Sequence, residues 1–191
     1  MFYSLFNDAS MMKILKTAWL AIIALLLCSA ANAQQKYQTR EGIIEVIGSH
    51  GDSIVIASSD HLFVLINYQT ADIKLSLDPG TLRTETDSLN VTLINSPLKP
   101  ILLEGKLNTP YVNTLQQPDQ ELNFTAQLRM NKIVNTIYAN GVLKHSTGSE
   151  TFSSILSLNF KLRLSDFGIV VPEVWGDEIT VRIYQAMLKN Q

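Results

Sequence analysis

Hydrophobic and polar residues alternate with a period of two over the C-terminal part of the chain. From 156 to 164 every second residue is leucine or phenylalanine, and the residues between them are serine, asparagine, lysine and arginine. The alternation returns over 179–184, after a loop marked by Pro172 and Gly176. Successive side chains of a strand point to opposite faces of the sheet, whereas a helix spaces its apolar positions by three and four residues. This pattern therefore predicts two antiparallel strands that close an all-β domain.

Apolar stretches upstream predict the remaining strands, and turn residues separate them. We expect strands over 42–49, 53–57, 61–66, 73–77, 101–107, 122–130 and 133–143, with turns at 49–52, 58–60, 78–80 and 131–132. The stretch 81–90 is a loop or a short helix, 91–94 can form a further strand, and 108–120 is a long connection or a frayed edge. About eight strands spaced by turns favour a sandwich or an up-and-down barrel.

The first 33 residues have the pattern of a secretory signal peptide. A short basic head precedes an apolar run over 17–27, and small residues end the segment at Ala33. We expect cleavage before Gln34, with the true start at Met11 or Met12. The apolar run is shorter than the roughly 20 residues of a membrane-spanning helix, and an uncleaved anchor is the alternative. Residues 34–191 are then a single domain in the periplasm of a bacterial envelope or outside the cell.

Cys28 is the only cysteine of the chain, and it lies inside this leader. A lipoprotein signal would make it the lipidated first residue, but Leu27 before it is bulky where such signals have a small residue. With cleavage before Gln34, the mature domain has no disulfide and no thiol nucleophile. Its stability must then come from its hydrophobic core, and a chain of this length can bury a sufficient one.

The charge of the chain excludes two classes of partner. The formal net charge is −2, and about −3 remains when the leader is removed. A slightly acidic domain lacks the basic field that drives nucleic-acid binding, and it lacks the polybasic cluster that holds proteins to anionic membranes. We therefore expect neither nucleic-acid binding nor stable membrane insertion.

Candidate catalytic and metal-binding residues are scattered along the chain. His50, His61 and His145 lie far apart without metal-ligand spacing, so a surface or turn position is favoured for each. The sequence has no Gly-x-Ser-x-Gly motif and no glycine-rich phosphate loop. Asp166 is expected to cap a turn, and the pair Asp177-Glu178 is expected to be solvated. We predict no catalytic residue, no metal and no cofactor, and a hydrolase is the weakest interpretation.

Large apolar side chains gather on one side of each alternating strand, and two interpretations stay open. A packed core explains them, since each buried side chain stabilises the fold by roughly 1.5–3 kcal/mol. A lined cavity also explains them, because an eight-stranded barrel is just wide enough either to fill itself or to hold one slim ligand. Strand parity gives as candidate lining residues Phe63, Leu65, Leu75, Leu103, Phe124, Leu128, Phe160 and Leu162.

Two segments resemble the YceI-like family. The stretch 160–169 (FKLRLSDFGI), followed by Val171-Pro172 and by 179–181, is similar to the C-terminal end of these proteins, and 99–107 (KPILLEGKL) is similar to their proline-led strand that ends in a glycine. The family's Gly-x-Leu-Thr-x-x-Gly stretch is reduced here to 126–132, and the segment before Pro100 is shortened. The resemblance implies a lipocalin-like antiparallel barrel over 34–191, exported, that carries a long isoprenoid or similar lipid chain in its interior.

We therefore expect a lipid-binding barrel whose partner is a hydrophobic small molecule of isoprenoid or fatty type, with a homodimer left open. The alternative is a structural or interaction domain with a filled core, whose loops 81–90 and 108–120 meet a protein or glycan. A small outer-membrane barrel is disfavoured, because the chain ends Lys189-Asn190-Gln191 without a terminal aromatic strand and its aromatic residues form no two girdles.

Overall fold

The computed structural model describes residues 36–98, 100–109, 112, 119–145 and 154–190. The predicted leader 1–33, with Cys28, lies outside the described residues. Within them the chain forms eight strands. Their bounds are β1 (Lys36–His50), β2 (Ser53–Asn67), β3 (Asp72–Leu77), β4 (Ile101–Lys106), β5 (Gln120–Met130), β6 (Ile133–His145), β7 (Ser154–Arg163) and β8 (Glu178–Asn190).

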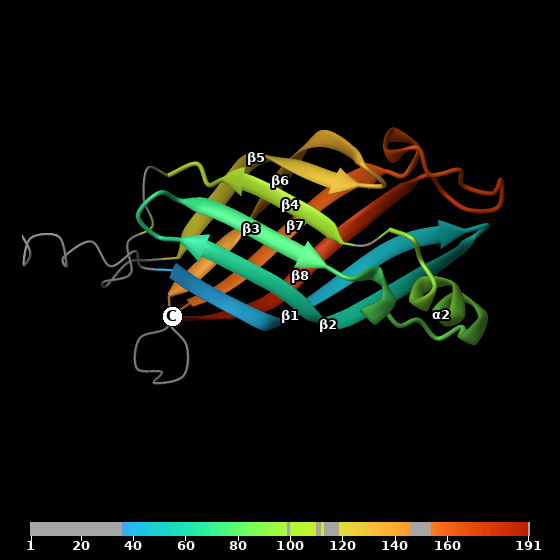
Figure 1. The fold of residues 1–191 in the computed structure, drawn as a ribbon, viewed down its shortest axis with the longest axis horizontal. Helices are drawn as coiled ribbons and strands as arrows, with labels where there is room; N and C mark the ends of the chain where they lie inside the picture. Colours follow the sequence, from blue (N-terminus) through green and yellow to red (C-terminus); the bar gives the residue numbers. More distant parts are fainter. Residues whose placement is uncertain (1–35, 99, 110–111, 113–118, 146–153, 191) are drawn as a thin grey trace, which may run out of the picture. The chain divides into compact units, whose positions relative to one another are not determined.

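The strands close into an up-and-down barrel (Figure 1). Each strand pairs antiparallel with the next strand along the chain, and β8 pairs with β1 to complete the circle. The predicted all-β class and antiparallel barrel of about eight strands are confirmed. Because every strand comes from the stretch 36–190, residues 35–191 form a compact unit by themselves.

The two ends of the barrel differ in their connections. At one end, here called the mouth, lie the β1–β2 turn, the β5–β6 turn, the β3–β4 connection with η1 (Pro79–Thr81) and α2 (Asp87–Ile94), and the β7–β8 connection with η2 (Ser165–Phe167). At the other end, here called the base, β1 begins, β8 ends and β2 turns into β3. Figure 1 shows α2 at the mouth and the C-terminus at the base. No helix of the described residues is long and apolar enough to cross a membrane.

Strand β2 corrects one expectation from the sequence. The turn predicted at 58–60 is a β-bulge, and β2 runs through it without a break. Ser59 pairs with Ile44 and Leu62 pairs with Gly42, so β2 has one residue more than β1 over this interval. Asp60 and His61 are both exposed as a result, and the inward side of the strand changes phase there.

The bulge decides which apolar residues of β2 face the core. Leu62, Val64 and Ile66 are buried, and the side chains between them face outward. Phe63 and Leu65 were expected to line the interior, but in the structure both side chains lie on the outer face of the barrel. The Arg40 guanidinium lies 5.3 Å from the centroid of the Phe63 ring on the outside of the barrel, a cation–π contact.

The stretch 91–94, expected as a strand, is instead the second half of α2. Asn90 fixes the start of this helix, because its side chain accepts a hydrogen bond from the backbone N–H of Thr84 (2.7 Å) and donates one to the Thr84 carbonyl (3.0 Å). Leu89 and Leu93 lie one turn apart on the half-buried face, and Val91 is exposed. Four consecutive residues are too few for the β-propensity of valine and isoleucine to decide the structure.

Candidate functional site

The mouth half of the barrel encloses an apolar cavity of about 170 Å³. Inward-facing side chains of the strands form its walls, and Leu82, Leu93, Leu98 and Ile169 from the mouth connections cover it. Ser76 and Ser96 are the polar members of the described lining. Toward the base, the cavity ends on a layer of side chains from seven strands, which are Ile44, Leu62, Leu75, Leu103, Leu128, Phe160 and Ile183.

The cavity continues into an apolar groove of about 420 Å³ at the mouth. Val55 and Ala57 of β2, Leu89 of α2 and the stretch 169–172 line this groove, together with Trp175. Both spaces share as lining residues Val46, Leu93, Ser96, Leu98, Leu164, Ile169 and Ile179. A continuous apolar surface therefore leads from the outside of the mouth into the barrel.

Backbone contacts hold the β7–β8 connection against the β1–β2 hairpin. The Gly51 N–H donates to the Val174 carbonyl (2.7 Å), and the Gly176 N–H donates to the Ser49 carbonyl (2.9 Å). The rings of His50 and Trp175 lie 4.7 Å apart between these two bonds. One side of the groove is thus fixed by the backbone.

Asp177 holds the start of the same connection. Its carboxylate accepts hydrogen bonds from the Ser165 backbone N–H (2.8 Å) and the Ser165 hydroxyl (2.6 Å). These bonds, the hydroxyl first, hold the pKa of Asp177 below its usual value. The capping role expected for Asp166 therefore falls to Asp177, which was expected only to be solvated.

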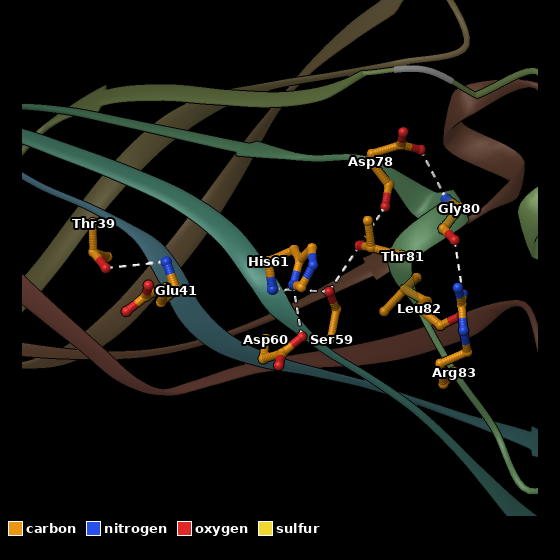
Figure 2. Close-up of polar contacts among 10 residues, drawn as sticks. All are labelled: Thr39, Glu41, Ser59, Asp60, His61, Asp78, Gly80, Thr81, Leu82 and Arg83. Atoms are coloured by element: carbon orange, nitrogen blue, oxygen red, sulfur yellow. Dashed lines mark hydrogen bonds and ion pairs between the residues drawn. The ribbon is translucent and has the colours of Figure 1, made fainter.

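Polar contacts attach η1, and with it the approach to α2, to the bulge of β2 (Figure 2). The hydroxyls of Ser59 and Thr81 share a hydrogen bond of 2.7 Å, and the Ser59 hydroxyl also accepts from the His61 backbone N–H (3.1 Å). The backbone of Arg83 exchanges two hydrogen bonds of 2.8 Å with that of Ser58. The bulge that changes the phase of β2 thus also anchors the cover of the cavity.

The described side chains of the base half are closely packed, since Ile66, Leu143, Leu156 and Leu188 are each 0% exposed. Phe160, Ala139 and Phe124 are register partners across β7, β6 and β5, so a small side chain lies between a ring of the cavity floor and the ring of Phe124. Closer to the base, Tyr37 and Tyr68 stack with ring centroids 4.0 Å apart. The cavity and the packed core, which were alternatives in the sequence, therefore occupy different halves of one barrel.

A buried hydrogen bond joins the Tyr68 and Ser154 hydroxyls in this packed half. Burial raises the pKa of Tyr68 to about 12, and the bond to Ser154 opposes that rise. Tyr68 is 1% exposed and Ser154 is 0% exposed, so each hydroxyl relies on the other in an apolar surrounding.

The eight candidate lining residues divide into three groups. Leu75, Leu103, Leu128, Phe160 and Leu162 line the cavity. Phe124 is buried but lies behind the cavity floor, and Phe63 and Leu65 face outward. The contact of any of them with a ligand stays a prediction.

The sequence interpretation missed the part of the lining that the connections supply. Leu93, Leu98, Ile169 and Trp175 have no periodic pattern around them, and single apolar residues in loops carry no signal of their own. The three histidines lie apart, since His50 contacts Trp175 with tilted rings, His61 pairs with Asp60, and His145 lies at the base end of β6. Among the described residues no three His, Cys, Asp or Glu side chains gather as metal ligands do.

Comparison with known proteins identifies the fold. A polyisoprenoid-binding domain from Saccharophagus degradans, implicated in plant cell wall breakdown, superposes with a TM-score of 0.61 at 11% identity, over 83% of this chain and 99% of that domain. BcnA of Burkholderia cenocepacia superposes with a TM-score of 0.57 at 8% identity, over 78% of this chain and 96% of BcnA. No protein-family model and no curated protein matches the sequence. The resemblance to YceI-like proteins is thus confirmed at the level of the fold, and the chain is an eight-stranded antiparallel barrel of YceI-like fold.

Proposed function

We propose that the protein is an exported binding protein for a long apolar chain of isoprenoid or fatty type, held in the mouth cavity and groove. The observation that carries this proposal is the continuous apolar lining from the groove to the cavity floor. An apolar chain gains free energy by leaving water and needs few polar partners, so this lining suits it. A ligand rich in hydrogen-bonding groups would lose its water without replacement there.

The two volumes indicate how such a chain is bound. An apolar cavity of about 150 Å³ is large enough for a ligand of the size of benzene. The barrel cavity, at about 170 Å³, therefore accepts one end of a chain. The rest of the chain lies in the groove of about 420 Å³, which is in the range of ordinary ligand sites, roughly 300–1,000 Å³. We propose that any polar head stays at the mouth.

The comparison supports the ligand class. The Saccharophagus degradans protein of the same fold is described as a polyisoprenoid-binding domain, so this barrel architecture accommodates such chains. The lining of described residues offers neither a metal cluster nor a charged group, and that favours binding over catalysis. Export follows from the leader predicted over 1–33. Recovery of the protein outside the cytoplasm with a mass that corresponds to a start at Gln34 would support export and cleavage, and recovery in the cytoplasm with the leader attached would contradict export.

Extraction of the purified protein with organic solvent, followed by mass spectrometry, tests the ligand. We expect a co-purifying isoprenoid or fatty chain at a near-stoichiometric level. Farnesol and geranylgeraniol should stabilise protein freed of that lipid, by about 2.7 kcal/mol at a concentration about 100 times the Kd. If no chain is extracted and neither alcohol raises the melting temperature, the interpretation as an interaction domain replaces this one.

A further inference from the structure

Exposed aliphatic side chains gather around the mouth of the barrel. The β1–β2 hairpin contributes Ile54 and Ile56, and α2 contributes Val91 and Ile94. The start of β6 contributes Ile133 and Val134, and the β7–β8 connection contributes Val170 and Val174. We call these eight residues the apolar rim. The other large apolar residues exposed in the described chain are Ile43, Tyr138 and Tyr184, on the barrel wall.

The rim surrounds the opening of the groove, because its four connections contact one another. The Asn131 side-chain amide donates to the Phe167 carbonyl (3.1 Å), which joins the β5–β6 turn to the β7–β8 connection. The bond between Gly51 and Val174 joins that connection to the hairpin. Val91 and Asn131 line one surface hollow, and α2 and the hairpin line the groove together. Val170 belongs both to the rim and to the groove lining, so the exposed aliphatic surface reaches the groove at that residue.

The charges at the mouth favour a partner surface that has no net charge. The described acidic residues of the four connections include Asp52, Glu85, Asp87 and Glu173, whereas Arg83 and Lys132 are their described cations. Arg83 already donates to the carbonyls of Gly80 and Leu82 (both 2.7 Å). Carboxylates repel anionic surfaces, and attraction to anionic lipids needs clusters of Lys and Arg.

We propose that the apolar rim is a docking surface for a bilayer of zwitterionic lipid, from which the bound chain enters the groove and to which it returns. This inference rests on the proposed function. Large exposed apolar patches mark protein or membrane partners. The exposed members of the rim are all isoleucine or valine, whereas the centres of protein interfaces are enriched in Trp, Tyr and Arg. A chain that leaves a bilayer through this rim also stays in apolar surroundings until it reaches the cavity.

Trp175 makes the proposal measurable. It lines the groove at the mouth and is the only tryptophan in residues 35–191. Vesicles of brominated phosphatidylcholine should quench its fluorescence, and the protein should float with the vesicles in a density gradient. High salt should leave binding unchanged, and added phosphatidylglycerol should weaken it, because the mouth is acidic. Absence of both quenching and flotation overturns the proposal, as does binding that requires the anionic lipid.

Two matched variants test whether the apolar rim is the surface that contacts the bilayer. The rim variant carries Ile54→Ser, Ile94→Ser and Val174→Ser, three exposed positions outside the lining of the cavity and the groove. The wall variant carries Ile43→Ser, Tyr138→Ser and Tyr184→Ser, with comparable exposure. We expect vesicle binding to fall by roughly tenfold or more in the rim variant and to stay unchanged in the wall variant, because bilayer affinity scales with the apolar area buried.

Binding of farnesol in detergent solution separates this inference from the proposed function. The rim variant should still bind farnesol, and that result also shows that the variant is folded. If the rim variant binds vesicles as well as the wild-type protein does and still binds farnesol, the rim is not the docking surface. The proposed function then stands unaffected. If the wild-type protein does not bind farnesol at all, the proposed function fails and the inference fails with it. If the wild-type protein forms a dimer that is lost in the rim variant, and the wild-type protein does not bind vesicles, then the rim is the contact with a second copy. That result overturns the bilayer as its partner.

Discussion

Replacing Leu103 by phenylalanine tests the mouth cavity as the binding site. Leu103 is 3% exposed and lies in the cavity floor, between its register partners Leu75 on β3 and Leu128 on β5. A phenylalanine ring at this position should point into the empty volume. Leu143 is the matched control, because it is also fully buried but lies in the packed half, outside the cavity lining.

The two substitutions should change stability with opposite sign. An empty cavity of 170 Å³ costs roughly 4 kcal/mol at about 24 cal/mol per Å³. The three extra carbon atoms of the ring fill only a small part of that volume, so Leu103→Phe should leave the free energy of unfolding unchanged or raise it by at most about 1 kcal/mol. Leu143→Phe should lower it by about 1–3 kcal/mol, since the packed half has no room for a larger side chain.

Urea unfolding of residues 35–191, followed by circular dichroism, measures the two stabilities, and the change in Trp175 fluorescence on addition of farnesol measures binding. Leu103→Phe should weaken farnesol binding by roughly tenfold or more, because the ring occupies the space for the end of the chain. The reasoning is refuted if Leu103→Phe destabilises the protein as much as Leu143→Phe does. It is also refuted if Leu103→Phe binds farnesol like the wild-type protein.

Three further predictions concern the barrel itself. Phe160→Asp should abolish folding, whereas Lys161→Asp on the outer face should be tolerated; equal behaviour in circular dichroism would contradict the strand parity. Tyr68 keeps its proton to about pH 12 when folded and loses it near pH 10 when unfolded, so the free energy of unfolding should fall by roughly 2–3 kcal/mol over that interval, and Tyr68→Phe should remove this loss in urea titrations. Gly141→Ala should destabilise the barrel by several kcal/mol in the same assay, because the new Cβ would lie 2.0 Å from a carbonyl oxygen of β7; a small effect would contradict the close approach.

The regular strands could be predicted because their alternation is unbroken. In β5 the burial alternates from Leu122 to Met130 as the sequence pattern does, and Asn131 and Lys132 turn the chain at φ values of 50° and 65°. In β2 the same logic gave the wrong face for Phe63 and Leu65. A bulge changes the phase of a strand without changing its composition, so the sequence contains no sign of it.

The cavity could not be predicted, because a residue that lines it and a residue of the packed core have the same pattern. Leu103 and Leu143 both face inward between outward-facing neighbours. The two leucines differ in whether side chains from the opposite wall of the barrel pack against them. That packing depends on the two rings beside Ala139 and on the bulge in β2. The cover of the cavity comes from connections, where tertiary contacts and not periodicity place each side chain.

Photolabelling with a diazirine-bearing isoprenoid alcohol tests most directly the claim that an apolar chain occupies the mouth of this barrel. The label reacts with the residues that it contacts, and peptide mass spectrometry then locates it. We predict labelled peptides from β4 and β5, which supply Leu103 and Leu128, and from the stretch 164–176, with loss of label in Leu103→Phe. Label confined to the outer wall or to the packed base, or label that Leu103→Phe leaves unchanged, would contradict the account.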